Sequence, residues 1–290
     1  MARFLVRLRE AVWHALDDDV VNTSKAVAYS GMLMLFPAMM VMATLLAQGP
    51  EGTTLVGEFR GVLEQFLPAD SMDLLQYSLE THRTLSAQLV LSGSGLSAFA
   101  ALGMMLSLME GFRRAYRLPR LEWGFWARRI RAVLLIFIAL IPLALAALLI
   151  IFGRQIEQWM VINSRHELRL VVLVFWRVVR WAIALLTSVS VLGALYHYGT
   201  RRTEDWAKVA PGAIASALGW FAATLVFGFY VTRIANYTMF YGSFGAGIAT
   251  LVWIYISAFC ALMGAELNAI LFRERRHEAS AQHDSYDPSL

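Results

Sequence analysis

The stretch that decides the fold is Tyr241 to Ile270, with the sequence YGSFGAGIATLVWIYISAFCALMGAELNAI. Residues 241–265 carry no charge, and a single acid, Glu266, stands close to the end of the stretch. An apolar run of this length is typical of a helix that crosses the ~30 Å hydrocarbon core of a membrane. An ionisable residue inside such a helix is by default a candidate functional residue.

The rest of the chain has the same apolar character. Hydrophobic residues make up 58% of it and charged residues 16%, which argues against a soluble domain of this length. The long charge-free stretches predict an all-α, polytopic membrane protein with six transmembrane helices in a single domain, residues 1–272. The predicted spans are approximately 26–48, 85–108, 132–153, 175–198, 209–231 and 244–270. The polar tail at 273–290 is predicted to be disordered.

The placement of Lys and Arg predicts the orientation of the spans. The segments before span 1, between spans 2 and 3, between spans 4 and 5, and after span 6 hold 17 of the 25 basic residues. Loops rich in Lys and Arg stay in the cytoplasm, so both termini are predicted to be cytoplasmic. The basic loops are also expected to contact anionic lipid headgroups.

Short amphipathic interfacial helices are predicted outside the spans. Residues 3–19 have one apolar and one charged face at helical spacing, and this helix either lies on the inner leaflet or packs under the bundle. The outer loop at 48–83 carries two further apolar faces at helical spacing.

Proline and glycine suggest where the helices bend and where they pack. Pro37 lies near the middle of the first span and Gly31 lies before it, which favours either a hinge or a proline tolerated for packing alone. Small residues allow helix backbones to approach closely. The predicted packing glycines are Gly212, Gly242, Gly245 and Gly247.

Five polar residues in or near the spans are candidates for binding a substrate. They are Arg177, Arg180, Glu266, Glu110 and Asn268. The two arginines either form a cationic strip for an anionic substrate or extend to the outer headgroups. The fourth span starts either near Leu170, which places both arginines inside the membrane, or at Trp181, which leaves the preceding residues as a helix on the outer surface. Each glutamate is either a proton or cation site or an ion-pair partner of loop arginines such as Arg113.

No residue pattern indicates catalysis. A metal-dependent nuclease needs clustered carboxylates or histidines, whereas the six histidines are scattered and the acids at 17–19 have only His14 nearby. The sequence therefore predicts no enzyme activity, no metal, no cofactor and no nucleic-acid partner. It leaves the oligomeric state open.

Three segments together resemble the YihY / virulence factor BrkB family of bacterial inner-membrane proteins. They are SKAVAYSGMLMLFPAMMVM at Ser24–Met42, APGAIASALGW at Ala210–Trp220, and the last span at Tyr241–Ala269. The chain departs from the family in the turn after the fourth span, where HYGTRRTEDW lacks the proline that is often found there.

The resemblance implies a multi-pass protein of the bacterial inner membrane whose biochemical role is not settled. Members were once labelled ribonuclease BN, a label regarded as wrong, and some are linked to serum resistance or to export of lipid-like envelope components. The expected function is a transporter or flippase of a lipid-like or anionic amphiphile in envelope biogenesis. The alternative is an envelope scaffold or virulence-associated membrane protein that transports nothing.

Overall fold

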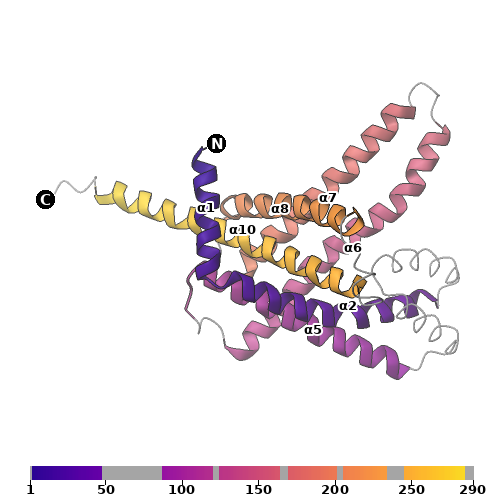
Figure 1. Cartoon of the computed structure of the whole chain (residues 1–290), viewed down its shortest axis with the longest axis horizontal. Coiled ribbons are helices and arrows are strands. Elements are labelled where there is room, and N and C mark those ends of the chain that lie inside the picture. The colour runs from indigo at the N-terminus through magenta and orange to yellow at the C-terminus, as the bar shows by residue number, and fades with distance from the viewer. Residues whose placement is uncertain are drawn as a thin grey trace. The chain divides into compact units, whose positions relative to one another are not determined.

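The computed structural model is all-α throughout the residues that it describes, which are 2–47, 87–119, 124–163, 169–200, 205–233 and 245–284 (Figure 1). Seven helices lie in these ranges: α1 (Ala2–Asp17), α2 (Val20–Ala47), α5 (Ala87–Ala115), α6 (Phe125–Asn163), α7 (Arg169–Gly199), α8 (Trp206–Arg233) and α10 (Gly245–Asp284). The predicted amphipathic helix at 3–19 corresponds to α1.

Five of these helices contain stretches long and apolar enough to cross a membrane: Val20–Met42, Val90–Ala115, Val174–Gly199, Trp206–Val231 and Gly247–Arg276. They confirm the prediction of an all-α, polytopic membrane protein. The predicted span at 132–153 lies within α6, and the side chains beyond residue 145 of that helix are outside the described set. The predicted helices of the 48–83 loop and the packing residue Gly242 also lie outside the described residues.

The last helix differs from the prediction at its end. α10 continues to Asp284, so residues 273–284 are helical where a disordered tail is expected. This segment, RERRHEASAQHD, has neither glycine nor proline, and more than half of its residues are Arg, Glu or Ala, which are good helix formers. The polarity of this segment indicates that the segment lies outside the membrane. Polarity alone does not end a helix.

The helices divide into two compact units, which are described separately. One unit comprises residues 21–108 and 220–259. In it, Gly31 on α2 lies against Ile254, since a methyl group added at Gly31 would be 3.0 Å from the Cγ2 atom of Ile254. The Ser97 hydroxyl on α5 donates to the carbonyl of Met34 at 3.4 Å. α2 is helical on both sides of Pro37.

The other unit comprises residues 1–20, 109–219 and 260–290. α6 and α7 pack along each other in it. The ring of Phe112, at the end of α5, meets Tyr196 of α7 edge to face with centroids 5.3 Å apart. A methyl group on Gly199 would lie 3.0 Å from the Phe112 ring. This unit holds the polar side chains that form the candidate site.

Candidate functional site

Two helices bring charged residues together by ending in left-handed turns. After α1, Asp19 has a φ of 62°, and after α5, Arg117 has a φ of 52°. The amides of Arg117 and Leu118 donate to the carbonyls of Arg114 and Arg113, at 2.8 and 3.0 Å. This is the bond pattern of a Schellman C-cap, which usually has glycine at the left-handed position. The turns redirect the chain immediately after Asp18 and at Arg117.

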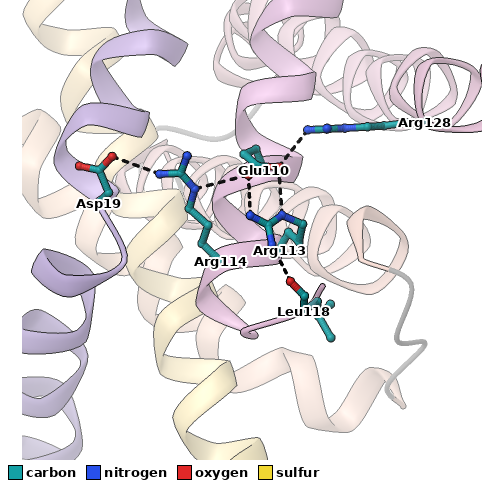
Figure 2. Close-up of polar contacts among 6 residues, drawn as sticks. All are labelled: Asp19, Glu110, Arg113, Arg114, Leu118 and Arg128. Carbon is teal, nitrogen blue, oxygen red and sulfur yellow. Dashed lines mark hydrogen bonds and ion pairs between the residues drawn. The ribbon is translucent and has the colours of Figure 1, made fainter. Parts of the chain in front are cut away.

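Glu110 is the centre of an ion-pair network at the end of α5 (Figure 2). Its carboxylate accepts from Arg113 at 2.6 and 3.1 Å, from Arg128 at 3.1 Å and from Arg114 at 3.4 Å. Arg114 also pairs with Asp19 at 3.1 Å. Arginines three and four residues after Glu110 face it across one helical turn, and Arg128 joins from α6. The structure therefore shows Glu110 as an ion-pair partner of arginines of α5 and α6.

Glu266 has a different environment from Glu110. Glu266 is fully buried, with 0% of the residue exposed, and neither of its carboxylate oxygens has a hydrogen-bond partner. The charged groups that act on it electrostatically are Asp18, Arg273 and Arg117. We call these four residues the Glu266 cluster.

The other members of the Glu266 cluster are also incompletely paired. The Oδ2 atom of Asp18 and one Nη atom of Arg273 are buried without a hydrogen-bond partner. Arg117 contacts the Nδ1 atom of His14 on α1 at 3.3 Å. Burial raises the pKa of Asp18 above its ordinary value, and this effect outweighs the attraction of Arg117, Arg273 and His14.

Asn268 lies two residues beyond Glu266 but contacts another helix. Its Oδ1 atom accepts from the amide of Gly212 at 2.8 Å, and its Nδ2 atom donates to the carbonyl of Val209 at 2.9 Å. One turn earlier on α10, a methyl group on Gly264 would lie 2.6 Å from the carbonyl oxygen of Gly212 and 2.7 Å from Ser216. Asn268 thus bonds to the start of α8, where the two helices are in close contact.

The remaining predicted residues lie elsewhere. Arg177 is exposed and Arg180 is half-buried, both within the candidate span Val174–Gly199. That span begins close to the earlier of the two predicted starts. The charged groups that act on Glu266 are on or beside α1, α5 and α10, so α7 does not contribute to the Glu266 cluster. Gly245 is buried at the start of α10, and a methyl group on Gly247 would lie 3.6 Å from Met32.

Sequence reasoning missed three members of the Glu266 cluster. In the sequence, Asp18 is one of three consecutive acids, and Arg117 and Arg273 are two of the basic residues that predict the orientation of the spans. Glu266 and Arg273 are seven residues apart, two turns along one helix face, and this spacing is a signal available from the sequence. Within the described ranges, no group of three or more His, Cys, Asp and Glu side chains could hold a metal ion.

Comparison with known proteins gives a consistent result over nearly the full chain. The sequence profile of the virulence factor BrkB family matches residues 11–288. The ribonuclease-like protein YfkH of Bacillus subtilis is 30% identical over 261 residues, which are 88% of this chain and 91% of YfkH. No solved structure matches the chain significantly.

Two longer relatives carry the name UPF0761 membrane protein. The protein of Nitrosospira multiformis is 25% identical over 91% of this chain and 61% of its own length. The protein of Chromohalobacter salexigens is 25% identical over 93% of this chain and 64% of its own length. The chain therefore spans less than two thirds of the length of these two relatives.

Proposed function

This chain belongs to the virulence factor BrkB family of multi-pass membrane proteins, and we propose that it is a transporter or flippase that moves a lipid-like or anionic amphiphile across the bacterial inner membrane. The observation that carries the proposal is the buried, unpaired carboxylate of Glu266 within the span Gly247–Arg276. The proposal makes the protein a carrier of envelope components and not an enzyme.

The energetic argument rests on the contrast between the two glutamates. An ionisable group buried without hydrogen bonds costs free energy that packing does not return. Glu110 offsets this cost with three arginines among the described residues, as a structural acid does. Glu266 has no such partner, although an apolar side chain of similar size would fill its site at lower cost. A carboxylate kept under these conditions in a membrane span is best explained by a role in transport.

The arginines of α7 support an anionic substrate. Arg177 is exposed and lies in the candidate span Val174–Gly199, so its guanidinium is available to a phosphate or carboxylate headgroup. Arg180 follows one turn later on the same face. The cytoplasmic arginines of the α5–α6 turn are proposed to hold anionic lipid headgroups of the inner leaflet. Nucleic acid, metal ions and cofactors have no part in the proposal.

The second candidate is an envelope scaffold that transports nothing. The close contact between α8 and α10 favours it, because Gly212 and Gly264 lie so near the opposite helix that neither has room for a methyl group. The Tyr196 hydroxyl adds a third helix by donating to the Ala261 carbonyl at 2.6 Å. A scaffold needs such a tightly packed region, although a transporter can also contain one.

Reconstitution tests the proposal directly. The full chain is placed in proteoliposomes that contain fluorescent phosphatidylglycerol, and the probe exposed on the outer leaflet is followed by chemical quenching. The protein should accelerate translocation of the probe over protein-free vesicles, and Glu266→Gln should lower the rate about tenfold, the equivalent of ~1.4 kcal/mol.

The matched control is Glu110→Gln, which removes an acid from the other network and should keep a rate within about twofold of the unmodified protein. The double change Arg177→Ala and Arg180→Ala should slow the anionic probe more than a fluorescent phosphatidylcholine. Equal rates with and without protein would support the scaffold. Unchanged transport by Glu266→Gln would remove this residue from the mechanism.

A further inference from the structure

We propose that α1 is an interfacial anchor, one face of which inserts into the headgroup region of the membrane. The leaflet concerned is the one on the side of the two termini, which the placement of Lys and Arg predicts to be the inner leaflet. The partner is therefore the surface of an anionic phospholipid bilayer. The face consists of Arg9, Val12, Trp13 and Leu16, and we call it the Trp13 face. The inference goes beyond the proposed function, because it applies to a transporter and to a scaffold alike.

The first argument is that α1 has two faces of opposite exposure. Ala11 and Ala15 are 0% and 2% exposed, so α1 packs on the rest of its unit through these two small side chains. Three large apolar side chains remain exposed, Val12 at 46%, Trp13 at 65% and Leu16 at 56%. The sequence left two positions open for this helix, on the inner leaflet or under the bundle. With two such faces, α1 packs under the bundle and still presents apolar side chains to the leaflet.

The second argument is the composition of the Trp13 face. Its members stand at positions 9, 12, 13 and 16, the i, i+3, i+4 and i+7 spacing of one helix stripe. Tryptophan and leucine are typical of the apolar side of helices that lie in a membrane interface. Arg9 is exposed in the same stripe, and an arginine there reaches the phosphate groups while its methylene chain stays among apolar side chains. The acids Glu10 and Asp17 are exposed too, but they lie to one side of the stripe.

The third argument is that two contacts hold α1 at the level of a membrane boundary. The Nδ1 atom of His14 contacts Arg117 at 3.3 Å, and Arg117 lies two residues beyond the end of the candidate span of α5. Asp19, the residue before the candidate span of α2, pairs with Arg114 at 3.1 Å (Figure 2). Both contacts join α1 or the turn after it to points where spans begin or end, so the Trp13 face is within reach of the headgroups.

Exposed tryptophans mark the same boundary elsewhere in this unit. Trp126 is the second residue of α6 and Trp206 is the first residue of α8, and they are 73% and 50% exposed. Both helices begin on the predicted cytoplasmic side, and tryptophan is enriched where a bilayer meets water. Trp13 thus has the position and the exposure of an interfacial aromatic residue.

The size of the Trp13 face favours a bilayer over a protein partner. A stable protein interface takes about 20–30 residues from each partner, whereas the Trp13 face has four side chains in the described part of α1. A bilayer needs no matching surface, because lipid adapts to the apolar side chains that enter it. The anchor also joins the lipid surface to the ion-pair network of Glu110, through Asp19 and Arg114.

Spin labelling of the full chain in nanodiscs of phosphatidylglycerol and phosphatidylcholine tests the inference. Cys260 is the only cysteine, so Cys260→Ala provides a background in which one engineered cysteine takes the label. A label at Leu16→Cys should be several-fold more accessible to oxygen, which dissolves in lipid, than to a water-soluble nickel complex. The matched control is Glu10→Cys on the same helix, which is exposed but lies off the Trp13 face. Its label should show the opposite preference.

The anionic character of the surface has its own test. In nanodiscs of phosphatidylcholine alone, the Leu16→Cys label should become more accessible to nickel, because Arg9 has lost the charge that attracts it. Arg9→Gln should have the same effect in phosphatidylglycerol, and Arg9→Lys should restore the original value. Equal accessibility in all of these samples would overturn the assignment of an anionic surface.

Three other results would overturn the anchor itself. A Leu16→Cys label as accessible to nickel as the Glu10→Cys label would place the Trp13 face in water. A label closed to both reagents would show that protein covers the face, and dipolar broadening between labels would identify a second copy there. If Leu16→Cys does not fold, Val12→Cys carries the label one turn earlier on the same face and decides the question in the same way. None of these measurements depends on lipid translocation, so the anchor and the proposed function stand or fall separately.

Discussion

The side chain of Asn268 on α10 holds the amide of Gly212 on α8 at 2.8 Å. Pro211, immediately before Gly212, lies inside α8 and has no amide hydrogen to donate. Asn268 therefore bonds to α8 at the point where proline interrupts the backbone hydrogen bonds of α8. The side-chain amino group of Asn268 also donates to the Val209 carbonyl. Two of the segments that define the family resemblance, Ala210–Trp220 and Tyr241–Ala269, meet at this contact.

The contact predicts a steric effect at Gly212. A methyl group there would lie under 3 Å from the carbonyl oxygen of Gly264 and from the Asn268 amide. Because one of these neighbours is backbone, Gly212→Ala should lower the free energy of unfolding by ~1–3 kcal/mol, measured by denaturation in detergent. The control is Gly219→Ala on the same helix, where a methyl group meets no atom within 4 Å. Gly219→Ala should be neutral or slightly stabilising, and equal effects would contradict the steric argument.

The hydrogen bonds of Asn268 predict a second loss of stability. Asn268→Leu keeps the approximate size of the side chain but leaves the Gly212 amide and the Val209 carbonyl without their side-chain partner. The expected loss is ~1–3 kcal/mol for each buried group left unsatisfied. Ser188→Ala is a suitable comparison because the Ser188 hydroxyl bonds only to Ala184 within α7. If the two variants unfold alike, Asn268 is not a structural bridge and its assignment as a substrate ligand regains support.

The half-buried carboxyl group of Asp18 predicts a pH dependence of stability. Its pKa is raised in the folded protein, so between the ordinary and the raised value the folded chain binds more protons than the unfolded chain. The free energy of unfolding should therefore fall as the pH rises through this window. Asp18→Asn should flatten the decrease, measured by denaturation in detergent at a series of pH values.

Asp205 provides a comparison of opposite sign. The hydrogen bond from Lys208, at 2.8 Å, lowers the pKa of Asp205. Its contribution is present above the ordinary pKa and is lost as the pH falls, and it should be small because the group is exposed. A steeper decrease in Asp18→Asn than in the unmodified protein would show that the sign assigned to Asp18 is wrong.

Replacing Pro37 should change stability and transport in opposite directions if Pro37 is a hinge. It has no amide hydrogen for the carbonyl of Leu33, so Pro37→Ala should restore a helical bond in α2 and raise stability by up to ~3 kcal/mol. If Pro37 is a hinge, the same change should slow lipid translocation. Pro142→Ala removes the proline inside α6 and should stabilise the protein without slowing lipid translocation. A Pro37→Ala protein that is stabilised and moves lipid at the normal rate would indicate that this proline serves packing only.

Much of the fold was predictable because membrane spans are local features of a sequence. The long apolar runs predicted all-α, polytopic architecture, and five candidate spans confirm it in the described residues. The end of α10 was wrongly predicted because polarity marks where a helix leaves the membrane, whereas backbone propensity decides where it stops. A helix often ends at a glycine in the left-handed conformation. The ends of α1 and α5 could not be predicted in this way, because Asp19 and Arg117 take the left-handed positions there.

The sequence by itself determined the class of protein, its family and the presence of Glu110 and Glu266 near the ends of apolar helices. It could not distinguish the two glutamates, because each is one acid beside an apolar run. Only the tertiary structure decided that Glu110 is surrounded by three arginines of α5 and α6, whereas Glu266 is buried beside Asp18 without a donor. The reason is physical: the cost of a buried charge depends on which groups from distant segments reach it, and the folded chain sets those distances.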